Sequence, residues 1–581
     1  MQIYLKEKIG LPELFTGRKK EMAYFERWIN RIESELSMSQ ALLSRRKTGK
    51  SAILQRLYNK TFDQNGMVVP FYFEIQESPM WLLDFSQEFL LAFVSQYLAF
   101  KTRQADYVDN PFTNFDEARR AIEQTDFTAL LGTIDSAVKA KAEKSPTMWD
   151  IARNAPRRIA ALNNERVVQF VDEFQHLSRY IYRDRDCTIR LSELPGTYLH
   201  TAEYKHAPLL VSGSWVGWLM DDLIRLLPGR FQFVPLQDMP EDESVEMIFK
   251  YAHTEELPIT DEVAYIMADL TEGNPFYISA LFRSIYFEKD FTTLEGLNET
   301  LEFETTNRQG MIRGTWMEYV ASALHRINDQ NAKNIVLYLC QHRDREVGRK
   351  ELLEKLTLEM TDAELNKRLL ALAYSDIIEY GRSNFYYRGV QDNIFDKVFR
   401  SQYADDIQEF DPAEIGRDYR VLLKAAQKKY RQLSGEYGHF KGKFAEYVVI
   451  NKLQYQVWKY QTRYLGMMEN LPDRFQFSQY KSVWSYSASP VQQRSIQIDV
   501  LARTKSDEPC LIGEVKNRAT TKFTLEEATH FHEKSDKVME LEQIKSAVLF
   551  VICTAGFPPE TLDFFRQYDI AWSTDARWFE Q

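Results

Sequence analysis

The sequence is poor in cysteine and contains no long hydrophobic run. Its 581 residues include only 4 cysteines, which are far apart and form no CxxC pair: Cys187, Cys340, Cys510 and Cys553. This spacing argues against a structural zinc site and against a disulfide framework, so we expect buried thiols. No run of about 18 apolar residues occurs, and the first residues lack the basic-then-apolar order of a secretory signal. We therefore expect a cytoplasmic protein without membrane partners.

An excess of positive charge is also missing. The formal net charge is −11, which excludes a global basic signature of nucleic-acid binding, so any contact with DNA must be local. The fractions of hydrophobic residues, 44%, and charged residues, 27%, are those of an ordinary folded protein. No internal repeat or low-complexity tract is present. The length is too great for one hydrophobic core and predicts several domains.

The chain is predicted to be an α/β multidomain protein. Short β-rich apolar runs (QALLS, MVVPFYFEI, RVVQFVDEF and APLLVSGS) alternate with helical stretches, which predicts a parallel sheet. A mostly helical region follows and is expected to form a lid. Three short helical segments and two strands then give the layout of a winged helix. After a charged helical connector, a second β-rich stretch predicts another α/β domain. The predicted domains are 1–235, 236–328, 329–402, 403–437 and 438–581.

A phosphate-binding loop is predicted at SRRKTGKS, which follows the strand QALL and opens a helix. In such a loop the backbone N–H groups and the helix N-terminus hold phosphate oxygens. Lys50 would meet the β- and γ-phosphates, and the Ser51 hydroxyl would join a Mg²⁺ shell. The usual first glycine is Ser44 here. The predicted nucleotide-binding residues of the loop are Arg46, Lys47, Thr48, Gly49, Lys50 and Ser51.

An acidic pair, Asp172-Glu173, ends the hydrophobic strand in VVQFVDEFQHL. We expect this strand to run beside the strand of the phosphate-binding loop, with Asp172 on the water-mediated Mg²⁺ shell and Glu173 polarising the attacking water. Taken alone, an acidic pair at the end of a strand is more often a solvated strand end or a helix cap. Its position after a phosphate-binding loop favours the catalytic interpretation.

In these motifs the sequence resembles the archaeal-type AAA+ ATPases, which are relatives of the STAND nucleotide-switch proteins. The resemblance spans roughly residues 10 to 400 and rests on segments that occur in order: FTGRKKEM, RRKTGKS, FVDEFQHL, LLVSGSWVGWL, and GRFQFVPLQDM followed by EGNPFYI. It implies a P-loop AAA+ parallel sheet with a helical lid and a winged helix, ATP as the nucleotide, and a homo-oligomer.

The resemblance also implies roles for individual residues. Gly17 and Arg18 would lie at the adenine side, and Pro275 would lie in the lid turn that closes over the base. Ser214 would be the sensor that touches the γ-phosphate, although it could merely end a strand. Arg230 is the candidate arginine finger. Arg225 competes for that role, and a surface ion pair is the simpler explanation of Arg230.

A second set of charged residues lies in two predicted strands near the C-terminal end, IQIDV and LIGEVK. Asp499 on the first strand and Glu514 with Lys516 on the second would meet across an antiparallel pair, because residues two apart share a face. Phosphodiester cleavage needs divalent cations held by carboxylates and a group that orients water. Asp499 and Glu514 suit Mg²⁺, and Lys516 suits charge stabilisation.

This set resembles the PD-(D/E)xK nucleases, in particular their Holliday-junction-resolvase-like and Mrr-like branches. The resemblance implies a restriction-endonuclease-like α/β domain and places a further acidic residue on the first helix, where GKFAEYVVINKL offers Glu446. The implied metal ligands are Asp499, Glu514 and Glu446, with Mg²⁺ or Mn²⁺ as the metal. Asn517 and Arg518 would contact DNA or belong to a solvated loop.

The leading functional hypothesis is an ATPase that controls or drives a Mg²⁺-dependent DNA endonuclease, acting on double-stranded or branched DNA in defence, mobile-element maintenance or repair. A first alternative is an ATP-dependent oligomeric switch whose C-terminal domain binds DNA without cutting it. A second is a ring-shaped motor that remodels DNA or protein. The segment DAELNKRLLALAYS would be the recognition helix of the winged helix, but it carries few basic residues, so an interdomain brace is the other interpretation.

Overall fold

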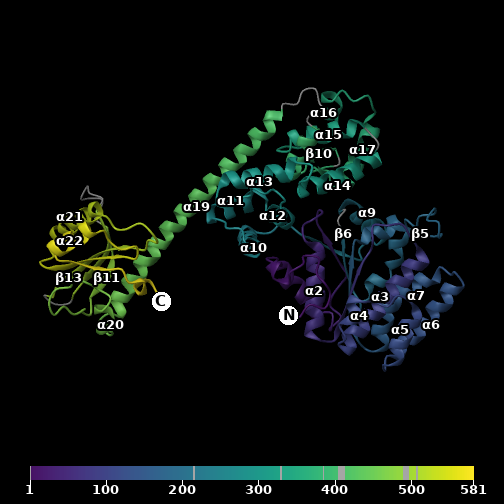
Figure 1. Ribbon diagram of the computed structural model, residues 1–581, viewed down its shortest axis with the longest axis horizontal. Coiled ribbons are helices and arrows are strands. Elements are labelled where there is room, and N and C mark those ends of the chain that lie inside the picture. The colour runs from purple at the N-terminus through teal and green to yellow at the C-terminus, as the bar shows by residue number, and fades with distance from the viewer. Residues whose placement is uncertain are drawn as a thin grey trace. The chain divides into compact units, whose positions relative to one another are not determined.

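The computed structural model describes residues 2–580 apart from 214–215, 328–329, 384, 404–411, 488–495 and 505–507 (Figure 1). Contacts between residues divide the chain into two units, residues 1–427 and 428–581, which are described separately below. The division falls within the long helix α19 (Pro412–Tyr455), and so does the predicted start of the last domain at residue 438.

The first unit is built on a parallel five-stranded sheet with the order β2-β4-β6-β1-β7. Its strands are β1 (Gln40–Leu43), β2 (Val68–Glu74), β4 (Arg166–Asp172), β6 (Leu209–Gly213) and β7 (Gln232–Pro235). The first four are almost wholly buried, as expected of strands covered on both faces. The predicted parallel α/β sheet is thus confirmed.

One prediction about this sheet was wrong. The strand that ends in Asp172 does not run beside the strand of the phosphate-binding loop, because β6 lies between them and pairs with both. Val211 on β6 is in register with Ala41 on β1 and with Val171 on β4. Each of these strands is apolar on both faces, so its own residues do not specify which strand becomes its neighbour.

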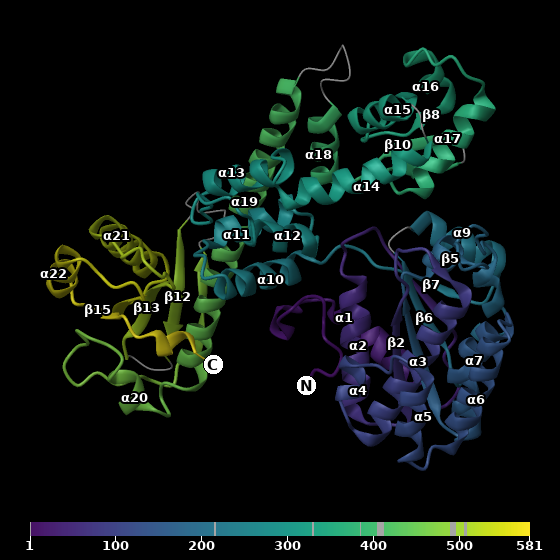
Figure 2. The same cartoon turned by 45° about the vertical axis from the view of Figure 1, so that its right-hand side comes forward.

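Helices cover both faces of the sheet (Figure 2), with α2 (Lys50–Gln64) on one side and α7 (Thr147–Leu162) on the other. Helix α3 (Leu82–Thr102) is buried around most of its circumference because it packs on β2 and is covered by further helices. The other elements of this part are α1 (Lys19–Asn30), α4 (Asp106–Asp109), α5 (Phe115–Glu123), α6 (Thr128–Ala142), α8 (Leu177–Tyr180), α9 (Val216–Leu226), and the short strands β3 (Met80–Trp81) and β5 (Ile181–Tyr182).

A helical region follows the sheet, as predicted. It contains α10 (Glu241–Thr254), α11 (Asp261–Leu270), α12 (Pro275–Phe282), α13 (Leu294–Thr306) and α14 (Met311–Ile327). Side chains of Thr260, Asn274 and Thr293 cap three of these helices by accepting a hydrogen bond from the first turn. Pro275 occupies the first helical position of α12, where its missing N–H costs nothing.

Residues 330–403, called here the wing unit, combine helices with a small antiparallel sheet. The helices are α15 (Gln330–Gln341), α16 (Arg349–Lys355), α17 (Asp362–Tyr374) and α18 (Asn393–Tyr403). The strands β8 (Val347–Gly348), β10 (Tyr386–Gly389) and β9 (Ile378–Tyr380) pair in that order. The two predicted strands are present, and the short β8 adds a third. That the wing unit is a DNA-binding winged helix stays a prediction.

The second unit contains a mixed five-stranded sheet in the order β11 (Ser482–Ser487), β12 (Gln497–Arg503), β13 (Cys510–Lys516), β14 (Ala547–Cys553) and β15 (Ile570–Ser573). β12 pairs antiparallel with both β11 and β13, whereas β14 pairs in parallel with both β13 and β15. Alternate residues of β12 face different cores: Val500 packs with α19, whereas Leu501 packs with α21 (Leu525–Leu541). The remaining helices are α20 (Gln461–Leu465) and α22 (Pro559–Gln567).

The structure shows which cysteines are buried and whether a described helix could span a membrane. All four cysteines are free, but only Cys340 and Cys553 are buried, whereas Cys187 and Cys510 are partly exposed. The expectation of four buried thiols was therefore wrong for two of them, because the low polarity of a thiol permits burial without enforcing it. Within the described residues, no helix is long and apolar enough to cross a membrane.

Candidate functional site

The phosphate-binding loop lies where the sequence predicts it, between β1 and α2. Gly49 precedes the helix with φ +95°, a left-handed conformation that a side chain would strain. Lys47 also has positive φ, +65°. A turn of this kind at the N-terminus of a helix is typical of an anion site, because backbone N–H groups can there bind negatively charged oxygens. Ser51 lies half-buried in the first turn of the helix.

Lys50 is buried above the loop. Its ammonium donates hydrogen bonds to the carbonyl oxygens of Ser44 (2.7 Å) and Arg45 (2.6 Å) and to the Ser44 hydroxyl (3.2 Å). Burial lowers the pKa of Lys50 to about 8, although the carboxylates of Glu173 and Asp172 favour the charged form. Ser44, which replaces the usual first glycine, is also hydrogen-bonded to Thr48 and thereby closes the loop.

Asp172 is almost completely buried at the end of β4 and is held by three donors. Its carboxylate accepts hydrogen bonds from the Ser212 hydroxyl on β6, from the Tyr72 hydroxyl on β2 (3.2 Å) and from the backbone N–H of Glu173 (3.1 Å). These bonds connect three adjacent strands at their carboxyl ends. A carboxylate that accepts several hydrogen bonds is held in one orientation.

Glu173 follows in a left-handed conformation with φ 55°, which ends the extended backbone of the strand. About 20% of its side chain is exposed, whereas Asp172 is 1% exposed, so the two carboxylates have different access to water. The Glu173 carboxylate accepts a hydrogen bond from the Gln175 amide at 2.6 Å. The structure thus brings Lys50, Asp172 and Glu173 together although β6 separates their strands.

Gly17 and Arg18 lie close to the loop from the N-terminal side. A side chain on Gly17 would come within 2.7 Å of the Glu243 carboxylate, which accepts a hydrogen bond from the backbone N–H of Arg18 at 2.6 Å. The Arg18 guanidinium donates to the carbonyl of Thr48 at 2.9 Å. A methyl group on Gly49 would lie 3.7 Å from the Pro275 ring. These residues therefore surround one side of the loop, and their contact with adenine stays a prediction.

The other predicted residues have diverse surroundings. The Lys47 ammonium lies 5.3 Å from the ring centre of Phe276, and the Arg46 guanidinium lies 5.1 Å from that of Tyr319. Arg230 forms an ion pair with Glu203 (2.9 Å), and Arg225 forms one with Glu193 (2.9 Å). A role as arginine finger would require either pair to open, and it stays a prediction. Ser214 lies outside the described residues.

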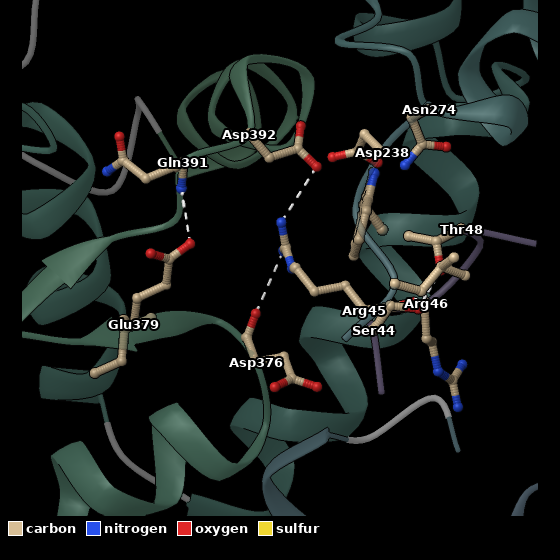
Figure 3. A pocket seen from close by; sticks show the side chains of 13 residues that line it. Ser44, Arg45, Arg46, Thr48, Asp238, Asn274, Asp376, Glu379, Gln391 and Asp392 are labelled. Atoms are coloured by element: carbon tan, nitrogen blue, oxygen red, sulfur yellow. Dashed lines mark hydrogen bonds and ion pairs between the residues drawn. The ribbon is translucent and has the colours of Figure 1, made fainter. Parts of the chain in front are cut away.

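A pocket of about 360 Å³ lies beside the loop, and Figure 3 shows the residues that line it. The Arg45 side chain extends from the loop across this pocket. Its guanidinium forms an ion pair with Asp392 at 3.3 Å and donates to the carbonyl of Asp376 at 3.4 Å. Both partners belong to the wing unit. Arg45 therefore ties the phosphate-binding loop to a part of the chain that is more than 300 residues away.

Aromatic side chains and a helix cap support this ion pair. The Arg45 guanidinium lies 5.2 Å from the ring centre of Trp316 and 5.3 Å from that of Phe395. Asp392 accepts a further hydrogen bond from the Tyr277 hydroxyl (2.6 Å), and its second oxygen caps α18 by accepting from the backbone N–H of Phe395 (2.8 Å). We call this arrangement the Arg45 clasp. The sequence did not predict it, because Arg45 appears there only as a member of the phosphate-binding segment SRRKTGKS.

In the second unit, the structure brings Asp499, Glu514 and Lys516 together as predicted. They lie on the antiparallel strands β12 and β13. The Lys516 ammonium is 3.0 Å from an Asp499 oxygen and 2.7 Å from a Glu514 oxygen. The Asp499 carboxylate also accepts a hydrogen bond from the backbone N–H of Val515 at 2.9 Å. Burial raises the pKa of Glu514, and the neighbouring Asp499 raises it further.

Glu446 on α19 belongs to the same electrostatic neighbourhood. Burial, followed by the charge of Asp499, raises the pKa of Glu446 to about 7. In the described part of the chain, no three His, Cys, Asp or Glu side chains are grouped closely enough to hold a metal ion. One observation nevertheless fits a cation: the second oxygen of Glu514 is buried and accepts no hydrogen bond within the described residues. The metal site stays a prediction.

Asn517 and Arg518 follow Lys516 at the end of β13. The Arg518 guanidinium pairs with Glu527 on α21 at 2.5 Å, and its backbone N–H donates to the Thr554 hydroxyl at 3.1 Å. Thr554 also lies 3.5 Å from the Asn517 side chain. These bonds connect the strand end to its neighbours and give both residues a structural role. Their contact with DNA stays a prediction.

No protein-family model matches the sequence, and no match to a curated protein was found. Solved structures similar to the chain include the Walker-type ATPase Paby2304 of Pyrococcus abyssi, with 14% identity, 69% of this chain and 100% of that chain covered, and a TM-score of 0.44. The Holliday junction branch migration motor RuvB of Thermotoga maritima is 12% identical, with 67% of this chain and 96% of that chain covered and a TM-score of 0.31. The Aeropyrum pernix ORC1 protein in complex with DNA is 12% identical, with 69% of this chain and 95% of that chain covered and a TM-score of 0.33. At these values the similarities carry no inference about activity, and the function has to be inferred from the residues of the site.

The Arg45 clasp leads to a prediction about stability. We expect Asp392→Asn to lower the free energy of unfolding of the first unit by about 2 kcal/mol, because it leaves the partly buried guanidinium without a carboxylate. Hydrogen exchange of the amides in α18 and α2 measures the effect locally. The matched control is Arg388→Gln, which breaks the more exposed ion pair with Glu379 (2.9 Å) in the same wing unit and should cost only about 0–1 kcal/mol. Equal exchange in both variants would contradict the prediction.

Proposed function

We propose that the first unit binds and hydrolyses ATP. The observation that carries this proposal is the convergence of Lys50, Asp172 and Glu173 at a phosphate-binding turn, with opposite charges at the carboxyl ends of parallel strands. Ligands of parallel α/β sheets bind at this edge. The triphosphate would lie against the N-terminus of α2, and the adenine side would face Gly17, Arg18 and Pro275.

The residues would divide the work of hydrolysis. Lys50 compensates charge on the β- and γ-phosphates. Glu173 accepts a proton from the water whose oxygen bonds to the γ-phosphorus, while the bond from that phosphorus to the bridging oxygen breaks. Ser51 and, through water, Asp172 would hold Mg²⁺, which neutralises charge on the phosphates. Asp172 is too buried to meet bulk water, so we assign the base to the more exposed Glu173.

For the second unit we propose a metal-dependent DNA endonuclease. Support comes from the close set of Asp499, Glu514 and Lys516, in which both carboxylates are buried, and from the Glu514 oxygen that has no hydrogen-bond partner among the described residues. The two carboxylates, with Glu446 as an outer contributor, would hold Mg²⁺ or Mn²⁺, and the metal would supply an activated water and charge neutralisation at the phosphodiester. Lys516 would stabilise negative charge on the phosphate. The DNA would be double-stranded or branched, in defence, mobile-element maintenance or repair.

A second candidate function is an ATP-dependent oligomeric switch that binds DNA without cutting it. The Arg45 clasp favours this candidate specifically, because it connects the phosphate-binding loop directly to the wing unit. A γ-phosphate near the loop would compete with Asp392 for the guanidinium. Under this candidate the protein binds ATP and changes its oligomeric state, and Arg230 or Arg225 reaches the neighbouring subunit. If the protein stays monomeric in the presence of ATP and DNA, the proposed oligomer is wrong for both candidate functions.

The hydrolysis proposal predicts different effects for two substitutions. Lys50→Ala should abolish phosphate release and weaken ATP binding, because the charge of the phosphates is no longer compensated. Glu173→Gln should leave ATP binding intact and slow turnover by about 10²–10⁴-fold, the usual contribution of a general base. Phosphate release and equilibrium binding of a fluorescent ATP analogue separate the two effects. Wild-type turnover in both variants would refute the site.

The nuclease proposal predicts that Asp499→Ala, Glu514→Ala and Lys516→Ala each abolish DNA cleavage while ATP hydrolysis persists. Loss of a carboxylate removes a metal ligand, whereas loss of Lys516 removes charge stabilisation, so Mn²⁺ binding measured by calorimetry should fail only in the carboxylate variants. Glu446→Ala should have a milder effect. The control is Arg577→Ala, which breaks an exposed pair with Asp575 in the same unit. Cleavage that survives all three main substitutions would show that the nuclease site lies elsewhere.

A further inference from the structure

Gln175 is a buried polar residue with no assigned role in the proposed hydrolysis of ATP. It lies in a short 3₁₀ turn, Phe174–His176, directly after Glu173, and its side chain is 0% exposed. The amide nitrogen donates a hydrogen bond to the Glu173 carboxylate at 2.6 Å. Burying an amide is costly unless it is hydrogen-bonded, so this contact is a strong constraint on both side chains.

The turn that carries Gln175 is itself fixed. The Ser178 hydroxyl shares its hydrogen between two acceptors, the backbone carbonyl of Gln175 at 3.0 Å and the Asp222 carboxylate on α9 at 2.6 Å. His176 in the same turn makes a hydrogen bond at 2.9 Å with the carbonyl oxygen of Ile75, just beyond β2. The Gln175 side chain therefore reaches Glu173 from a rigid support and not from a loose loop.

The other end of the Gln175 amide faces the end of β6. Its oxygen is buried and has no hydrogen-bond partner within the described residues. A methyl group on Gly213 would overlap this oxygen, so glycine at this position leaves room for the amide. Gln175 thus occupies the space between the ends of β4 and β6, where the proposed reaction takes place.

We propose that Gln175 is the positioning residue of the general base: its amide holds one oxygen of Glu173 so that the other oxygen takes the proton from water. The inference rests on the proposed ATP hydrolysis and deepens it. A glutamate side chain has three rotatable bonds, and a base must lie within hydrogen-bond reach of the proton it removes. Without the amide the carboxylate would leave this geometry for a large part of the time.

Gln169 provides a matched comparison. It is a glutamine on β4, it is also 0% exposed, and its amide donates a hydrogen bond at 2.8 Å. Its oxygen likewise has no hydrogen-bond partner among the described residues. However, the acceptor is the backbone carbonyl of Ala207, which precedes β6, and Glu173 is not involved. Gln169 therefore has the burial and the hydrogen bond of Gln175 without its contact to the base.

The test compares Gln175→Met with Gln169→Met in the full chain. Methionine keeps the length of the side chain and removes the donor. We expect Gln175→Met to slow phosphate release by about 10- to 100-fold, part of the contribution of a general base, while the affinity for a fluorescent ATP analogue changes less than about twofold. Gln169→Met should keep wild-type turnover. If Gln175→Met does not fold, Gly213→Ala displaces the same amide from the other side and should slow turnover in the same way.

A double-mutant cycle separates positioning from a merely structural role. In the Glu173→Gln background the base is already absent, so adding Gln175→Met should slow turnover by less than about twofold. Equal slowing in both backgrounds, or wild-type turnover in Gln175→Met, would overturn the inference. Failure of the proposed function has a different signature, because wild-type protein would then release no phosphate at all, and that result would overturn both proposals.

Discussion

The Arg45 guanidinium in the first unit is a charge that cannot move without loosening three parts of the fold. It extends from the phosphate-binding loop, lies beside the rings of Trp316 and Phe395, and pairs with Asp392, which caps α18. A charge in such low-dielectric surroundings is tolerated only with its partner. The loop, the helical region and the wing unit therefore have to keep their relative positions, and any ligand that attracts Arg45 acts on all three.

In the second unit, buried charges likewise depend on ion pairs with their neighbours. Lys516 lies within ion-pair distance of Asp499 and Glu514, which are both buried on neighbouring strands. Burial is the main reason why the pKa of Glu514 is raised, and the charge of Asp499 raises it further, because one cation compensates two carboxylates only in part. A divalent cation would complete the compensation and would also bind the Glu514 oxygen that has no hydrogen-bond partner within the described residues.

Sequence patterns predicted the features that depend on residues close together in the chain. The buried strands, the turn around Gly49 and the meeting of Asp499 with Lys516 follow from local periodicity and from register on adjacent strands. The insertion of β6 between β4 and β1 could not be predicted from strands that are apolar on both faces. The Arg45 clasp could not be predicted either, because its partners are 347 residues apart and its stabilisation comes from tertiary packing. The role inferred for Gln175 depends on a hydrogen bond that no spacing reveals.

With the two proposed functions, one chain would carry two separate phosphate chemistries. The most direct test follows both in one experiment: full-length protein with Mg²⁺ is given labelled linear, branched and single-stranded DNA, each with and without ATP, and released phosphate and strand breaks are measured together. We expect phosphate release that needs ATP and Mg²⁺, and strand breaks in at least one DNA that disappear when EDTA is added. Binding of ATP with neither phosphate release nor strand breaks in any DNA would contradict this expectation and would favour the switch.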